Sequence, residues 1–139
     1  MCIRDSNIIK LNNIDWEYIP DWWIGYKGWE SEIPRDMLPG DGLQGFKIVK
    51  SDNPVACLWW HIMEGSKTML VNPVIMDPNY REDDRKEIID TLIQSITKFA
   101  EDSGCKYLWS WTENGRLANV FDRNGYDVTN NAFEIIKHI

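Results

Sequence analysis

The sequence predicts an α/β domain built on a strand–helix–strand–helix unit. Two strand-like segments, 68–76 and 106–111, are separated by one long segment whose apolar residues recur at helical spacing. A shorter helical segment follows and ends at Gly125. Strands that alternate with helices in this order are typical of two roughly parallel strands joined by a crossover helix.

The chain is expected to begin with short elements. Residues 8–11 predict a first strand. The aromatic stretch 15–29 contains Pro20 and Gly25, so we expect a short helix followed by a loop or a second short helix. Residues 33–42 are rich in proline and glycine and predict a loop, in which Pro34 could open one helical turn.

Antiparallel hairpins are predicted next. Alternating apolar residues indicate three strands, at 46–50, 55–63 and 68–76. Turn-forming residues at 52–54 and 64–66 separate them, so consecutive strands should pair back on one another. Residues 133–139 predict a final strand.

Pro73 stands inside the third of these strands, where a proline removes one backbone donor from the sheet. Prolines are tolerated in strands at a bulge or at a sheet edge, and both interpretations stay open.

The long helix is predicted by an apolar stripe at spacings of three and four. Its members are Ile88, Ile89, Leu92, Ile93, Ile96, Phe99 and Ala100. Pro78 precedes the helix, acidic residues crowd its first turn, and Gly104 is suited to end it.

The last part of the unit is short. Tyr107, Trp109 and Trp111 alternate with smaller side chains in a strand. Residues 114–124 then carry an inward-facing set of apolar residues, and Asn124-Gly125 is suited to a left-handed helix end.

Composition and charge describe a soluble globular chain of 139 residues, which we expect to form a single domain over 1–139. The net charge of −7 argues against a nucleic-acid partner, since binding DNA or RNA requires a basic face. No stretch approaches the roughly 20 apolar residues of a membrane span, so no membrane partner is expected. Three cysteines without a paired spacing suggest free thiols and a cytoplasmic location.

Residues 1–6 resemble a translated sequencing-adapter scar. On that interpretation the native N-terminus would be missing, and these residues would not belong to the fold.

The middle and end of the chain resemble the GCN5-related N-acetyltransferase (GNAT) superfamily. The segment Met76-Asp77-Pro78-Asn79-Tyr80-Arg81 matches the first half of that family's apolar-x-Pro-x-aromatic-Arg/Gln-x-x-Gly-x-Gly/Ala signature. Downstream, Asn114, Leu117, Phe121, Gly125 and Tyr126 keep the family's spacing. The resemblance implies a divergent GNAT-like fold, with a mixed, mainly antiparallel sheet and helices on both faces. It also implies that the strand 68–76 carries a bulge and separates from the strand 106–111 near Pro73.

The resemblance also implies acetyl-CoA, or another acyl-CoA, as cosubstrate and no metal. The residues placed at the cosubstrate by the matching positions are Ile75, Met76, Arg81, Glu82, Asp83, Asp84, Arg85, Lys86, Asn114 and Phe121. In the family, a pyrophosphate group lies on backbone N–H groups at a helix start, where the helix dipole favours an anion. For Asn114, a role as the N-cap of the last helix is an equally open interpretation.

This chain departs from the family pattern at two places. Asp84 and Lys86 occupy the two glycine positions of the phosphate loop, where a Cβ atom narrows the approach of a phosphate and the Asp84 carboxylate repels it. The loop's acids and bases cancel to a neutral segment. Both a weakened phosphate site and an ordinary helix start, stabilised by acids in its first turn, stay open. Phe121 occupies the position where many members carry a tyrosine that protonates the departing thiolate. A phenylalanine donates no proton, so it is expected to act as a core aromatic.

No catalytic residue is assigned by the sequence; His61 and Asn72 are the candidates. His61 lies in an alternating strand, where it would act as a base toward an amine or serve a structural role. The early tryptophans, with nearby acids, would form either a cation pocket or a helix packed on the sheet.

The resemblance implies transfer of an acetyl group from acetyl-CoA to the amine of a small molecule or peptide. The alternative is a GNAT-fold protein that has lost catalysis and serves in binding or regulation. The sequence leaves the acceptor, the acyl group and the oligomeric state open.

Overall fold

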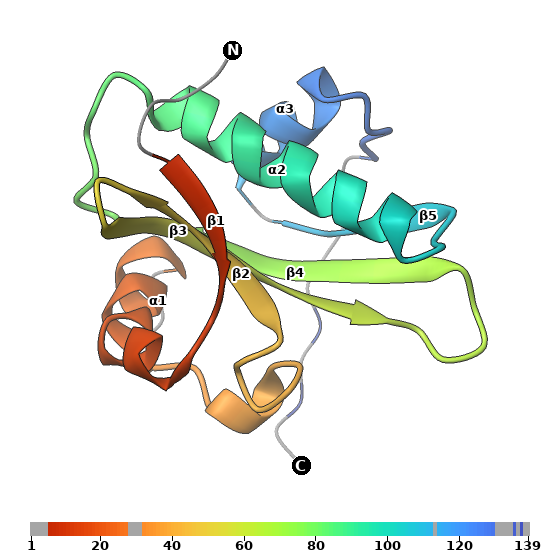
Figure 1. Cartoon of the computed structure of the whole chain (residues 1–139), viewed down its shortest axis with the longest axis horizontal. Helices are drawn as coiled ribbons and strands as arrows, with labels where there is room; N and C mark the ends of the chain where they lie inside the picture. The colour runs from red at the N-terminus through yellow and green to blue at the C-terminus, as the bar shows by residue number, and fades with distance from the viewer. Residues whose placement is uncertain (1–5, 28–31, 113, 130–134, 136, 138–139) are drawn as a thin grey trace.

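The computed structural model describes residues 6–27, 32–112, 114–129, 135 and 137. Its centre is a five-stranded sheet in the order β1-β2-β3-β4-β5 (Figure 1). The strands are β1 (Ser6–Lys10), β2 (Gly45–Lys50), β3 (Asn53–Ile62), β4 (Thr68–Met76) and β5 (Tyr107–Trp109). Pairing is antiparallel from β1 to β4 and parallel between β4 and β5, so the predicted mixed, mainly antiparallel sheet is confirmed.

Helices cover both faces of the sheet, as expected. The long helix α2 (Arg85–Asp102) and the short helix α3 (Gly115–Arg123) lie on one face, and α1 (Ile19–Lys27) lies on the other (Figure 1). The predicted apolar stripe of α2 is largely buried, with Ile88 and Ile93 fully covered. Within the described ranges, no helix is both long enough and apolar enough to cross a membrane.

The sheet separates two apolar clusters. The larger one, on the α2 and α3 side, includes Leu58, Met69 and Phe121. The smaller one, on the α1 side, includes Trp23 and Trp59. Fully burying one such side chain contributes about 1.5–3 kcal/mol, so both helix layers are held mainly by apolar contact.

Strand β4 carries a bulge at Pro73, as one of the two open interpretations predicted. Leu58 pairs with Val74 and Trp60 pairs with Val71, so two residues of β4 lie opposite Trp59 alone. The peptide bond between Asn72 and Pro73 is cis. An extra residue reverses the alternation of side chains between the two faces.

Strands β4 and β5 separate before the bulge. Their parallel pairing joins Thr68 to Tyr107 and ends where Leu70 meets Trp109, three residues before Pro73. The expected separation near Pro73 is therefore confirmed. Strand β5 is shorter than the predicted 106–111, because no β4 partner lies beside residues 110–111.

A short 3₁₀ helix, η1 (Asn13–Glu17), precedes α1, so the predicted short helix followed by a second one is confirmed. The break lies at Tyr18, however, and α1 runs unbroken through Pro20 and Gly25. A further 3₁₀ helix, η2 (Arg35–Met37), forms the single helical turn that Pro34 could open.

Pro20 lies in the first turn of α1, where a helix needs no backbone donor. Gly25 faces Pro78, and a Cβ atom there would lie 2.8 Å from the Pro78 ring. The glycine thus allows α1 to pack closely against the chain that follows β4.

Two further expectations concern the chain ends. Ser6 of β1 pairs with Lys50 of β2, so the sheet begins at the last residue of the segment that resembles a scar. The final strand predicted over 133–139 falls almost wholly outside the described residues.

The early tryptophans pack on the sheet. Trp22 and Trp23 of α1 are buried, and the indole N–H groups of Trp16 and Trp59 both donate to the Gly42 carbonyl, at 3.0 and 2.9 Å. Trp29 lies outside the described residues. These contacts support the packing interpretation of this segment.

Candidate functional site

A cavity of about 390 Å³ opens between the end of β4, the start of α2 and one side of α3. Its floor is apolar, formed by Val74, Ile75 and Met76 of β4 with Ile89, Leu117 and Val120 of the helices. Its walls are polar, formed by Asp83, Arg85, Lys86, Asn114, Arg116 and Arg123. The cavity lies beside the stretch of β4 that has no β5 partner.

Six of the ten residues predicted at the cosubstrate line this cavity. They are Ile75, Met76, Asp83, Arg85, Lys86 and Asn114. The other four do not line it. Arg81 and Glu82 are exposed on the preceding loop. The Asp84 carboxylate contacts Lys50 and Tyr80, and the Phe121 ring contacts that of Tyr126. Their predicted contacts with a cosubstrate remain predictions.

The cavity is basic. Among the described residues that line it are four cationic side chains, on Arg85, Lys86, Arg116 and Arg123, and one carboxylate, on Asp83. The sequence predicted a neutral phosphate loop because it counted only residues 81–86. Helix α3 adds two arginines, and Asp84 is not part of the lining, so the enclosed charge favours an anion.

The first turn of α2 offers backbone donors to this cavity. The Arg85 N–H donates to the Glu82 carbonyl at 3.2 Å, and the Asp84 side chain gives no cap. In the described part of the chain, the N–H groups of Lys86 and Glu87 meet no backbone acceptor. Free N–H groups at a helix start carry partial positive charge and bind anions.

The Asp84 carboxylate is held by two neighbours. It accepts hydrogen bonds from the Lys50 ammonium of β2 and from the Tyr80 hydroxyl. The Lys50 contact, followed by the Tyr80 contact, holds the pKa of the Asp84 carboxyl below its usual value. Asp84 therefore presents a neutralised carboxylate at a position where the resembled family has glycine.

This lowered pKa has a consequence for stability at acid pH. Because folding lowers the pKa, the stability that the contact contributes is fully present above the unfolded value of about 4. It is lost as the pH falls through the lower folded-state pKa.

The start of α3 is closed by its own cap. The Asn114 side chain accepts from the Arg116 N–H at 2.9 Å and from the Leu117 N–H at 3.2 Å. The capping interpretation of Asn114 is thus confirmed, and the same residue also lines the cavity. At the start of α3 the Arg116 and Leu117 N–H groups are therefore occupied, whereas the Lys86 and Glu87 N–H groups at the start of α2 have no backbone acceptor among the described residues.

Comparisons with known proteins agree on the architecture. A transcriptional regulator from Bacillus halodurans superimposes with a TM-score of 0.71 at 12% identity, over 95% of this chain and 99% of that chain. The ribosomal-protein-S18-alanine N-acetyltransferase from Escherichia coli gives 0.69 at 15%, over 89% and 79%. AAC(6')-Iy, solved with the bisubstrate analogue CoA-S-monomethyl-acetylneamine, gives 0.63 at 16%, over 96% and 99%.

The chain has the GNAT fold. The resemblance to a divergent GNAT member, drawn from residues 76–126, is confirmed at the level of the fold. No protein-family model and no curated protein matches the sequence.

In this GNAT fold, Asn72 bridges the separation between β4 and the chain after β5. With its amide oriented to satisfy both groups, Asn72 donates to the Trp111 carbonyl at 2.9 Å and accepts from the Trp111 indole N–H at 3.2 Å. His61 is exposed on β3, where it pairs with Leu70. Neither His61 nor Asn72 lines the basic cavity, so the structure does not bring these two candidates to it.

Phe121 is a core aromatic, as expected. It is 5% exposed, and its ring meets that of Tyr126 edge-on at 4.9 Å. It faces a second cavity of about 590 Å³, between β5, α3 and residues 126–129, which meets the basic cavity at Asn114. In that second cavity the Ser110 hydroxyl is buried without a partner among the described residues.

Sequence reasoning missed two cationic residues of the cavity lining and the lysine that neutralises Asp84. Arg116 and Arg123 are seven positions apart, which places them on one side of α3, and this spacing was a usable signal. Lys50 lies 34 positions before Asp84, and no local pattern connects the two.

Proposed function

We propose that this GNAT-fold chain is an acyl-CoA-dependent N-acyltransferase that moves an acetyl group from acetyl-CoA to an amine. The observation that carries the proposal is the basic cavity at the open start of α2. Coenzyme A is strongly anionic, and Arg85, Lys86 and the N–H groups of α2 supply the complementary charge. The apolar end of β4 suits the uncharged arm that carries the thioester.

Bound acetyl-CoA would supply an activated acyl thioester. The chain's own contribution is then binding and orientation, because holding two reactants in line lowers the entropic part of the barrier. The amine nitrogen attacks the carbonyl carbon, the carbon–sulfur bond breaks, and the nitrogen loses a proton to water. Phe121 has no hydroxyl, so the leaving thiolate takes its proton from solvent rather than from that position.

The acceptor we propose is a small molecule or peptide with a primary amine. Structural neighbours support this class, since AAC(6')-Iy was solved with an analogue that joins coenzyme A to an acetylated neamine.

A second candidate is a protein that binds coenzyme A without catalysis. Two observations favour it: Phe121 lacks the hydroxyl of a general acid, and one structural neighbour is a transcriptional regulator. Loss of a general acid typically costs about 10²–10⁴ in rate.

Calorimetric titration tests the shared part of both candidates. Coenzyme A should bind more tightly than pantetheine, which has the same arm without the nucleotide phosphates. Equal affinity for the two ligands would contradict the proposed site. Release of free thiol from acetyl-CoA, measured against a panel of primary amines, then separates enzyme from binding protein. Binding without amine-dependent thiol release would reject the enzyme and retain the second candidate.

Lys50 provides a prediction about the neutralised carboxylate. We expect Lys50→Met to weaken coenzyme A binding about threefold to tenfold, because it returns a full negative charge to the start of α2. Adding Asp84→Asn to that variant should restore most of the affinity. Calorimetry on both variants measures this, and a double variant as weak as the single one would show that Lys50 acts in another way.

A further inference from the structure

Helix α3 places two arginines on the basic cavity, and they differ in their bonding. The Arg123 guanidinium donates from Nε to the Asp90 carboxylate of α2 at 2.9 Å, and its Nη2 atom lies 2.8 Å from the same oxygen in an ion pair. The Arg116 guanidinium is exposed and has no hydrogen-bond or ion-pair partner in the part of the chain that the structure describes. Arg116 is therefore the α3 cation that remains available to a ligand.

The cavity attracts anions at two distinct places. One is the start of α2, where Lys86 joins the open backbone donors. The other is the Arg116 side chain; the backbone N–H groups of Arg116 and Leu117 already donate to the Asn114 side chain, so the guanidinium is the charged donor that α3 adds. A ligand with a single phosphate group would satisfy only one of these places.

We propose that Arg116 binds the 3′-phosphate of coenzyme A, so that the cavity distinguishes coenzyme A from dephospho-coenzyme A. This inference rests on the proposed function. Coenzyme A carries a pyrophosphate on one side of its ribose and a separate phosphate on the 3′-oxygen. With the pyrophosphate at α2, the second anionic group needs its own cation, and a guanidinium can bind a phosphate through two parallel hydrogen bonds.

The other cations of the cavity are less suited to this second group. Arg123 would have to share its guanidinium with Asp90, which already neutralises it. The Arg85 Nε atom lies 3.2 Å from the Met76 sulfur, so this side chain is held at the end of β4. Lys86 belongs to the first turn of α2, where the pyrophosphate would bind.

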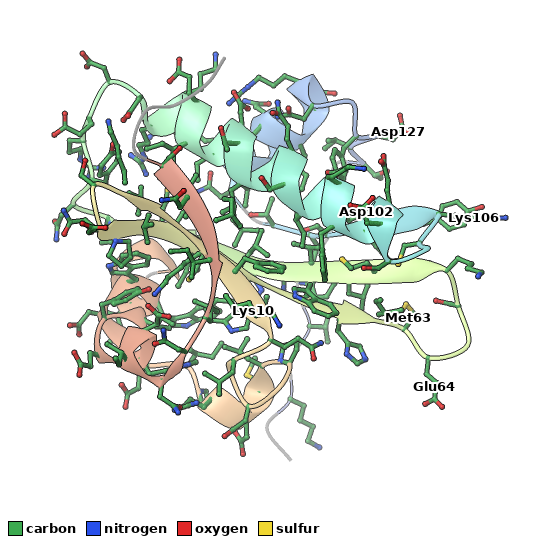
Figure 2. All side chains as sticks on the ribbon, in the orientation of Figure 1. Lys10, Met63, Glu64, Asp102, Lys106 and Asp127 are labelled. Carbon is green, nitrogen blue, oxygen red and sulfur yellow. The ribbon has the colours of Figure 1, made fainter. Side chains whose placement is uncertain are left out.

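The test compares two ligands on three proteins: wild type, Arg116→Gln and a control of equal charge, Lys106→Gln. Lys106 follows α2 at the end opposite to the cavity and projects into solvent (Figure 2). Wild type and Lys106→Gln should bind coenzyme A about tenfold more tightly than dephospho-coenzyme A in calorimetry. Arg116→Gln should lose that preference and bind dephospho-coenzyme A as wild type does.

Each outcome separates this inference from the proposed function. If wild type binds coenzyme A and dephospho-coenzyme A equally, the role of Arg116 is rejected and the function stands. If Arg116→Gln weakens both ligands to the same degree, Arg116 contributes only general charge, which also rejects the inference. If wild type binds neither ligand, the proposed function itself fails. An unchanged urea midpoint for Arg116→Gln excludes loss of folding as the cause.

Discussion

Asp15→Ala is expected to lower the free energy of unfolding by about 3–5 kcal/mol, the range measured when one partner of a buried ion pair is removed. Asp15 is 2% exposed and accepts hydrogen bonds from the Lys47 ammonium and the Tyr18 hydroxyl, both at 2.7 Å, and from the Asn12 N–H at 2.8 Å. The Lys47 side chain is only 12% exposed, so the substitution leaves a positive charge with little access to water. Urea unfolding measures the change.

Two controls separate the buried charge from a general effect of removing a carboxylate. Asp102→Ala breaks a pair with Lys98 whose side chains are 61% and 70% exposed, and should cost less than about 1 kcal/mol. Adding Lys47→Met to Asp15→Ala removes the stranded charge and should recover part of the loss. A double variant less stable than Asp15→Ala would show that Lys47 stabilises the fold by other contacts.

Lys86→Glu is expected to weaken coenzyme A binding by about 100-fold. The substitution reverses one charge in the cavity beside the open N–H groups of α2, so an attraction to the pyrophosphate becomes a repulsion. An acidic residue in the first turn favours a helix, so the variant should fold as well as wild type. The difference should shrink as salt is raised, because ions screen an exposed charge.

The control for this variant is Lys106→Glu, which makes the same change in net charge far from the cavity (Figure 2). It should bind coenzyme A almost as wild type does. Equal weakening by Lys86→Glu and Lys106→Glu in calorimetry would mean that overall charge, rather than the cavity, governs affinity.

Several features of the fold could be predicted because they depend on neighbours in sequence. The apolar stripe of α2 was visible at spacings of three and four, and its buried face has the expected members. Pro73 indicated a bulge or a sheet edge because a proline cannot donate within a strand, and the family resemblance indicated that β4 separates from β5 there. The spacing from Met76 to Tyr126 led to the GNAT fold.

Other features could not be predicted because they join distant segments. Gly25 was interpreted as a helix interruption, and only its contact with Pro78 explains why α1 tolerates it. Asp84 was interpreted as an obstacle to phosphate, since a sequence pattern gives no indication that Lys50 neutralises it.

The sequence by itself determined the five strands of the described sheet, the two helices of the central unit and the resemblance on which the proposal of coenzyme A rests. Those properties come from side-chain periodicity and turn chemistry, which act over a few residues. The tertiary structure alone decided the charge of the candidate site. It brings Arg116 and Arg123 of α3 to the start of α2 and turns Asp84 toward Lys50, so a loop that is neutral in sequence borders a basic cavity. Electrostatic attraction depends on distances in space, and folding sets those distances.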